Sequence, residues 1–189
     1  GGKAKGSVRM SQLDLYRLPE ANLDIDLNAD RLHLADAKDS IEVYVDSLDF
    51  CLVTKRGKID EEQKRESRMM ELNASVDTIR AVYGKEIDFK GRNIKLSMKN
   101  DAGVLSRKDT TIFYPMIGHF TGYLLSLKDG DETSFDLKET DNTFRITHIN
   151  EDSKIPLLSF SSTNKVIRAK STEGRVLATG VRISARARK

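Results

Sequence analysis

Apolar and polar residues alternate along most of this chain, in runs that share one regular interruption. In the stretch 72–83, apolar residues occupy every second position up to Val76, which is typical of a strand with one buried face. The next apolar residue is Ile79, three positions further on, and the alternation then resumes. The skipped pair, Asp77 and Thr78, is polar and turn-prone.

The interruption predicts a β-bulge in each strand. A flat strand would send the second apolar set to the opposite face, whereas one extra residue keeps both sets on the same side and bends the strand. Six runs carry the same gap. Their skipped pairs are Asp30-Arg31, Asp46-Ser47, Asp77-Thr78, Arg92-Asn93, Thr121-Gly122 and Thr179-Gly180. We therefore expect neighbouring strands to bend alike.

The fold class predicted from these runs is all-β: a long antiparallel meander of seven or eight strands, bulged and curled into a groove or an open barrel-like trough. Turns are expected at 35–40, at Gly84–Glu86, which makes a hairpin, and at Lys128–Glu132, which has Asp-Gly at its centre. A second hairpin is expected from 135–137 and 144–146, with a looser connection at Glu139–Asn142.

The expected organisation is a flexible start over residues 1–8 and a single β-groove domain over 9–189. A first short apolar run is expected at 13–18. The stretch of about 55–70 alternates charges of both signs with almost no apolar residue, which predicts a mobile loop. We expect the chain to be a piece excised from a larger protein.

Polar residues fill the positions between the apolar ones, so one side of the sheet is predicted to be wet and the other dry. Seven or eight strands of this length present an apolar face on the order of 1,000 Å². A soluble monomer rarely exposes so large an apolar patch. Because no amphipathic helix is predicted to cover it, the sheet must curl onto itself, pack against a second sheet, or hold an apolar ligand.

Composition and charge exclude several classes of function. The net charge of +3 gives no strong attraction to nucleic acid, and no run of 18 apolar residues predicts a membrane-spanning segment. The single cysteine, Cys51, lies between two apolar positions and should point away from the apolar face. The three histidines have no metal-ligand spacing, and no phosphate-binding loop or nucleophile motif occurs, so we predict no enzyme, metal or cofactor.

Two charged segments each allow a functional and a purely structural interpretation. Three acidic residues at Asp129, Asp131 and Glu132 could hold calcium but lack the ligand series of a dedicated loop, so a plain turn is preferred. Arg182, Arg186, Arg188 and Lys189 form a basic end. It could touch anionic headgroups, but a charged edge that discourages sheet-to-sheet aggregation is preferred.

The phrases at 28–34, 74–84 and 87–99, with an apolar alternation and a polar slip such as Asp77-Thr78, resemble the AsmA-like and TamB-related family of Gram-negative envelope proteins. The resemblance runs from about Leu23 to Met98 and returns faintly at 176–185. It implies a periplasmic protein, anchored in the inner membrane through its parent chain, whose β-groove shields acyl chains. The family is linked to outer-membrane biogenesis and to phospholipid transport between membranes.

The function predicted from these observations is non-enzymatic lipid handling, with a phospholipid or another acyl-chain ligand and the rest of the parent chain as partners. The residues expected to line the lipid groove are Ile41, Val43, Val45, Leu48, Phe50, Leu52, Leu72, Val76, Ile79, Ile94, Leu96 and Met98. Each could instead be ordinary core. The alternative function is a β-sandwich adhesion or carbohydrate-binding module at the cell surface, and a third is a structural strut in a larger sheet.

Overall fold

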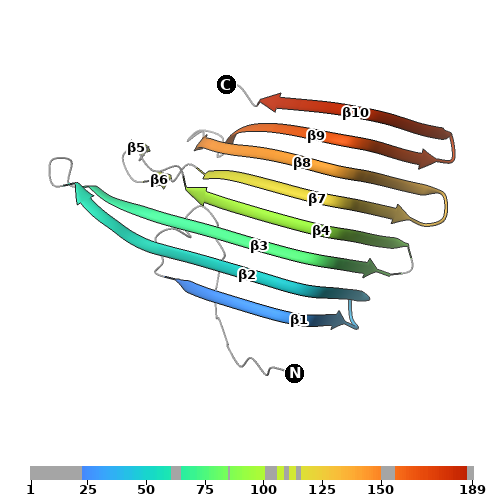
Figure 1. The fold of residues 1–189 in the computed structure, drawn as a ribbon, viewed down its shortest axis with the longest axis horizontal. Helices are drawn as coiled ribbons and strands as arrows, with labels where there is room; N and C mark the ends of the chain where they lie inside the picture. The colour runs from blue at the N-terminus through green and yellow to red at the C-terminus, as the bar shows by residue number, and fades with distance from the viewer. Residues whose placement is uncertain are drawn as a thin grey trace.

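The structure, a computed structural model, is built from long antiparallel strands (Figure 1). It describes residues 23–60, 65–84, 86–100, 106–108, 111–113, 116–149 and 156–186. One eight-stranded sheet has the order β1-β2-β3-β4-β7-β8-β9-β10. Its strands are β1 (Asp24–Asp36), β2 (Ile41–Asp60), β3 (Arg65–Tyr83), β4 (Ile87–Asn100), β7 (Met116–Asp129), β8 (Thr133–Ile149), β9 (Pro156–Ser171) and β10 (Gly174–Arg186). A separate two-stranded sheet joins β5 (Ser106–Lys108) to β6 (Thr111–Phe113).

The predicted fold class is confirmed. The eight long strands follow one another as a meander, and the sheet curls without closing into a barrel. Within the described residues, β1 and β10 each pair on one side only, so both edges of the sheet are open. The same part of the chain contains no helix, and hence no helix that could cross a membrane.

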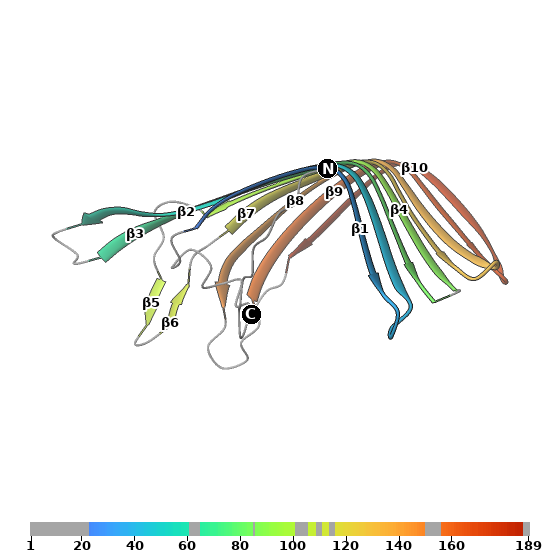
Figure 2. The same ribbon diagram turned by 90° about the horizontal axis from the view of Figure 1, so that it is seen from below.

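All eight strands bend along one common line (Figure 2). The register of each strand pair is the same immediately before and after this line, but at the line itself each strand has one residue that pairs with neither neighbour. We call these residues the kink line. They are Asp30, Ser47, Asp77, Asn93, Tyr123, Glu139, Lys165 and Gly180. All eight are exposed.

The kink line differs from the isolated bulges that the sequence predicts. A single bulge sets two residues opposite one and shifts the register. Here every strand carries its extra residue at the same place, so the extra residues face one another and the register is kept. The bend therefore runs straight across the sheet.

Positive φ angles alternate along the kink line. They occur at Ser47 (55°), Asn93 (49°), Glu139 (47°) and Gly180 (64°), which belong to β2, β4, β8 and β10. Because neighbouring strands are antiparallel, these four strands run in one direction and the other four in the opposite direction. Strands of the two directions thus make the same bend with different backbone conformations. Only β2, β4, β8 and β10 use the left-handed region, which favours Gly and Asn.

The apolar sets on either side of the kink line share the inside of the bend. A methyl group added at Gly91 would collide with the side chain of Ile94, three residues on, and would lie 2.8 Å from Cγ2 of Ile79. Side chains on opposite arms of a bent sheet approach one another only on its inner side. The apolar face is therefore the concave face, as predicted.

Several sequence-based expectations are wrong. The expected connection Glu139–Asn142 lies in the middle of β8, because its inward positions are polar and hide the alternation. In β7 the residue that leaves the pairing is Tyr123, whereas the sequence pattern predicts the skip at Thr121-Gly122. The pattern counts Tyr123 as an inward apolar residue, but its side chain points out of the trough and is half exposed. The loop expected at 55–70 is largely strand, since backbone pairing between β2 and β3 extends to Asp60 and resumes from Arg65, although few residues there are apolar.

The three expected turns are confirmed at positions 37–40, at Gly84 and Glu86, and at Gly130–Glu132. The expectations for residues 1–8, for the run at 13–18 and for Arg188 and Lys189 lie outside the described residues.

The alternation of positive φ predicts which kink-line residues tolerate a β-branched side chain. Asn93→Val should lower the free energy of unfolding by about 1–2 kcal/mol, because valine is strained in the left-handed region. Asp77→Val, on the neighbouring strand without a positive φ, is the matched control and should stay within about 0.5 kcal/mol. Urea unfolding measures the free energy of both variants. Equal losses would contradict a different backbone conformation at the bend in neighbouring strands.

Candidate functional site

The concave face carries apolar rows that run across the sheet from edge to edge. In each row, the residues are register partners and so point to the same side. On one arm, the outer row is Leu34, Val43, Ala81, Phe89, Leu127, Phe135, Ala169 and Val176. The row beside the bend is Leu32, Val45, Ile79, Gly91, Leu125, Leu137, Ile167 and Ala178. Both rows are apolar in all eight strands.

Much of this apolar arm is open to solvent. Leu127 is 43% exposed and Val176 is 61% exposed, and Leu34, Ile41, Tyr83, Ile87 and Phe135 are also exposed. Large exposed apolar side chains that line one concavity mark an interaction site more often than scattered ones do. The trough wall on this arm is therefore the first candidate for a binding surface.

The far end of the other arm is ordinary core. Leu52, Met70 and Met116 are buried together, and Met70 is fully covered. Partly buried apolar residues pack against them: Leu23, Ile25, Phe50, Leu72, Met98 and Ile146. For this end of the trough, the interpretation as plain core accounts for the burial.

The twelve residues predicted to line the groove all come from β2, β3 and β4, and the structure places them on the inward phase of these strands. Phe50, Leu52, Leu72 and Met98 belong to the core end. Leu96 lies on the same arm as these four, in the row of Phe50, and the other seven line the opposite arm and the bend. Their contact with a lipid stays a prediction.

A polar block interrupts the apolar wall on β8 and β9, and the sequence did not reveal it. Thr140 and Asn142 pair with Asn164 and Ser162, respectively, just beyond the bend. All four side chains are buried on the concave side. We call them the polar block. The missed signal is the spacing: they occupy every second position, where the apolar residues of other strands lie.

Hydrogen bonds link the polar block internally. The Asn142 amide donates to Thr140 Oγ1 at 2.9 Å and to the Phe120 carbonyl at 3.3 Å. The Asn164 amide donates to Ser162 Oγ at 2.8 Å. Its carbonyl oxygen, Oδ1, is buried and has no hydrogen-bond partner among the described residues.

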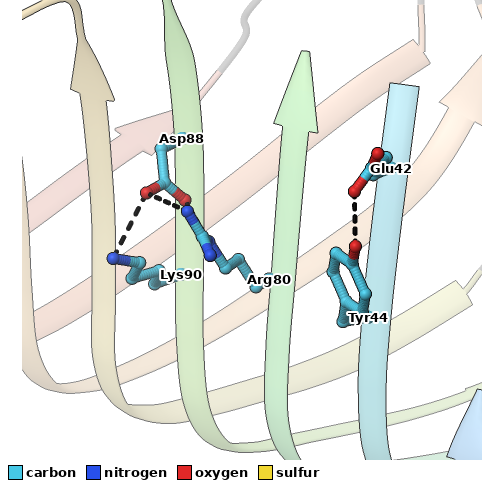
Figure 3. Close-up of polar contacts among 5 residues, drawn as sticks. All are labelled: Glu42, Tyr44, Arg80, Asp88 and Lys90. Carbon is cyan, nitrogen blue, oxygen red and sulfur yellow. Dashed lines mark hydrogen bonds and ion pairs between the residues drawn. The ribbon is translucent and has the colours of Figure 1, made fainter. Parts of the chain in front are cut away.

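The convex face carries ion pairs and hydrogen bonds between strands (Figure 3). Arg80 holds Asp88 through two hydrogen bonds of 3.0 and 3.1 Å, and Lys90 Nζ lies 3.2 Å from the same carboxylate. The hydrogen bond from Arg80, helped by Lys90, lowers the pKa of Asp88. On β2, Tyr44 donates to Glu42, which raises the pKa of Tyr44. These contacts lie among exposed groups and fix the sheet rather than build a reaction centre.

An open hollow of about 390 Å³ lies on the convex side, over β2, β3, β4 and β7. Asp49, Cys51, Lys95 and His119 are among its lining residues. Cys51 thus points away from the apolar face, as predicted. His119 bonds to Asp141 at 2.8 Å. No nucleophile–base pair forms here, and the described residues contain no group of three or more His, Cys, Asp or Glu placed to hold a metal ion.

Comparisons of the chain with models of protein families, with curated proteins and with solved structures found no match. The candidate site therefore stands on its own geometry: an apolar concave wall, a buried polar block and a hydrophilic back.

Gly118 leaves room for an aromatic side chain on the concave wall. Its register partner is Phe144, and a methyl group added at Gly118 would collide with the Phe144 ring. Gly118→Ala should therefore cost about 1–3 kcal/mol of unfolding free energy. Gly174→Ala is the matched control, because nothing lies within 4 Å of that position. A tolerated Gly118→Ala would show that the ring does not pack over the strand.

The ion pairs of Asp88 predict a pH-dependent contribution to stability. Because its pKa is lowered on folding, the contribution is present above the unfolded pKa of about 3.9 and is lost as pH falls through the folded pKa. Asp88→Asn should cost about 0.5–1 kcal/mol at neutral pH and little near pH ~2. Asp49→Asn is the control, since no described residue bonds its carboxylate. Urea unfolding across pH measures both, and a loss independent of pH would contradict the ion-pair account.

Proposed function

We propose that this chain is a non-enzymatic lipid-handling domain whose trough shields acyl chains from water. One observation carries the proposal: the concave wall is apolar across all eight strands on one arm and keeps large side chains exposed there. A wall of this kind inside a bend, with a hydrophilic back, gives an acyl chain an apolar surface on more than one side.

The dimensions of the trough suit an acyl chain. Eight strands have seven spacings of about 4.8 Å, so the trough is about 34 Å long along the kink line. One leaflet's share of a bilayer's hydrocarbon core is about 15 Å thick, half of ~30 Å. An extended acyl chain therefore fits along the apolar rows.

The energetics favour binding without a specific polar contact on this arm. Burial contributes about 0.8 kcal/mol per CH₂, so a sixteen-carbon chain would gain on the order of 10 kcal/mol if fully covered. An open trough covers only part of the chain, which lowers this gain. Because the rows are continuous, the chain meets similar surface at each strand and can move along the trough.

The cellular setting is part of the proposal and is supported by the sequence resemblance. On this proposal the domain belongs to an AsmA-like protein of the periplasm, anchored in the inner membrane through its parent chain, and serves outer-membrane biogenesis or phospholipid transport between membranes. The open edges at β1 and β10 offer backbone groups to further strands of that parent. No observation favours a sandwich module, since the second sheet among the described residues is only the two-stranded pair of β5 and β6.

The proposal predicts that acyl-chain lipids co-purify with the protein and that one charge in the trough removes them. Leu127→Asp places a carboxylate on the exposed apolar arm, where a bound chain would have to cover it. Bound lipid should fall about tenfold or more. Mass spectrometry of organic extracts measures the amount per mole of protein.

The matched control is Leu177→Asp. Leu177 is 66% exposed but pairs with Arg168 on the convex face, so this variant adds the same charge outside the trough and should retain wild-type lipid. Circular dichroism checks that both variants keep the sheet. A wild-type extract without acyl lipid, together with no binding of a fluorescent fatty acid, would overturn the proposed function.

A further inference from the structure

We propose that the polar block on β8 and β9 is a recognition site for the polar end of the ligand. Specifically, it takes a hydroxyl or an amide N–H carried at the end of an apolar chain. This inference rests on the proposed function and names the chemistry of the ligand's polar group, which the apolar rows leave open.

The first observation is where the block lies. Thr140, Asn142, Ser162 and Asn164 form a two-by-two patch on the concave side. Apolar residues surround it in the register: Phe120 and Val181 on the neighbouring strands, and Leu137, Ile167, Phe144 and Phe160 along its own strands. It is thus a small polar spot in an apolar wall, the usual composition of a ligand site.

The second observation is the unpaired carbonyl of Asn164. This side chain is only 4% exposed, yet its Oδ1 lacks a donor among the described residues, while its amide nitrogen is engaged with Ser162. Buried polar groups in native proteins are almost always paired, and leaving one unpaired is costly. A hydroxyl or N–H from a ligand would supply the missing donor.

The chemistry of the block excludes a charged end. Its four side chains are neutral, and a buried ammonium or carboxylate without a counter-charge is far more costly than a neutral donor. An ester offers only acceptors and cannot pair with a carbonyl oxygen. A hydroxyacyl chain and an N-acyl chain both carry the required donor beside an apolar tail.

In the proposed binding, the ligand enters from the side of the edge strand β10, and side chains over the block must move, because Asn164 Oδ1 itself has almost no exposed surface. Ile183, the register partner of Ser162, is 45% exposed, and the block lies only one strand from the open edge. A ligand that enters beside Ile183 brings its polar end to the block while its chain turns along the apolar rows across the bend.

The test compares ligands that differ only in the donor. Displacement of a fluorescent fatty acid from the wild-type protein is measured with decan-1-ol against its methyl ether, and with N-methyldecanamide against N,N-dimethyldecanamide. We expect each donor to bind about three- to tenfold more tightly than its donor-free partner. A preference in one pair only assigns the site to a hydroxyl or to an amide, and either outcome supports the proposal.

Variants test whether the preference comes from Asn164. Asn164→Leu has nearly the same shape and should abolish the preference with a smaller loss of Tm than Asn142→Leu, because it breaks one hydrogen bond, to Ser162, but also removes a buried unpaired oxygen. Asn142→Leu is the matched control: it breaks two hydrogen bonds, to Thr140 and Phe120, and should lower Tm by about 4 °C or more. An equal loss of Tm in Asn164→Leu would show a structural role and overturn the inference.

The outcomes separate this inference from the proposed function. Equal binding of donor and donor-free ligands by the wild-type protein refutes the polar site and leaves acyl-chain binding standing. Absence of binding by all four ligands and by the fluorescent fatty acid refutes both. The wild-type comparison decides the matter even if a variant fails to fold.

Discussion

The structure depends on one constraint: every strand of the large sheet must carry its extra residue at the same place. Side chains alternate with period two, so a one-residue change in count sends all later side chains to the other face. If β3 ran through Asp77 as a regular flat strand, Val76 and Ile79, which are three residues apart, would point to opposite faces. The neighbouring strands would then present apolar residues next to polar ones in every row beyond the bend. The common position of the extra residue keeps the rows aligned over eight strands.

The constraint also explains the polarity of the two sides. A residue at the kink line leaves the ladder, so its backbone groups need water or a side chain. The eight residues there are exposed, and two of them, Lys165 and Glu139, form an ion pair at 2.7 Å. The outer side of the bend is therefore hydrated, while the inner side gathers the apolar sets from both arms. A wet ridge and a dry trough are two consequences of one irregularity.

Most of the fold could be predicted because its signal repeats. The gap of three between apolar residues is visible at Asp46-Ser47 and at Arg92-Asn93, and it predicted both the bend and the common face. The sequence could not show that the extra residues face one another without a register shift, since pairing is a property of two strands. Nor could it show the alternation of φ, which depends on strand direction.

The polar block could not be predicted from the sequence, because it lies where the alternation of apolar and polar residues breaks down. In β8 and β9, polar residues occupy inward positions, so the alternation disappears and the pattern predicts two short strands around Glu139–Asn142 in place of β8. Local rules fail most often at functional or strained positions. Ordinary sheet packing would favour apolar residues at these positions, as in β2 to β4. Their polarity, and the unpaired oxygen of Asn164, need a reason other than the stability of the sheet.

The difference between the two arms of the trough offers a reason for the polar block. The core end is closed around Met70, whereas the opposite arm is apolar and open. The polar block lies between them, beside the bend and near one edge. A ligand with an apolar chain and a neutral polar end can satisfy both surfaces in one orientation only, with its chain across the bend on the open arm. A wall of uniform polarity would hold the chain equally well in either direction. The asymmetry of the wall therefore gives the proposed ligand an orientation, which the fold alone could not supply.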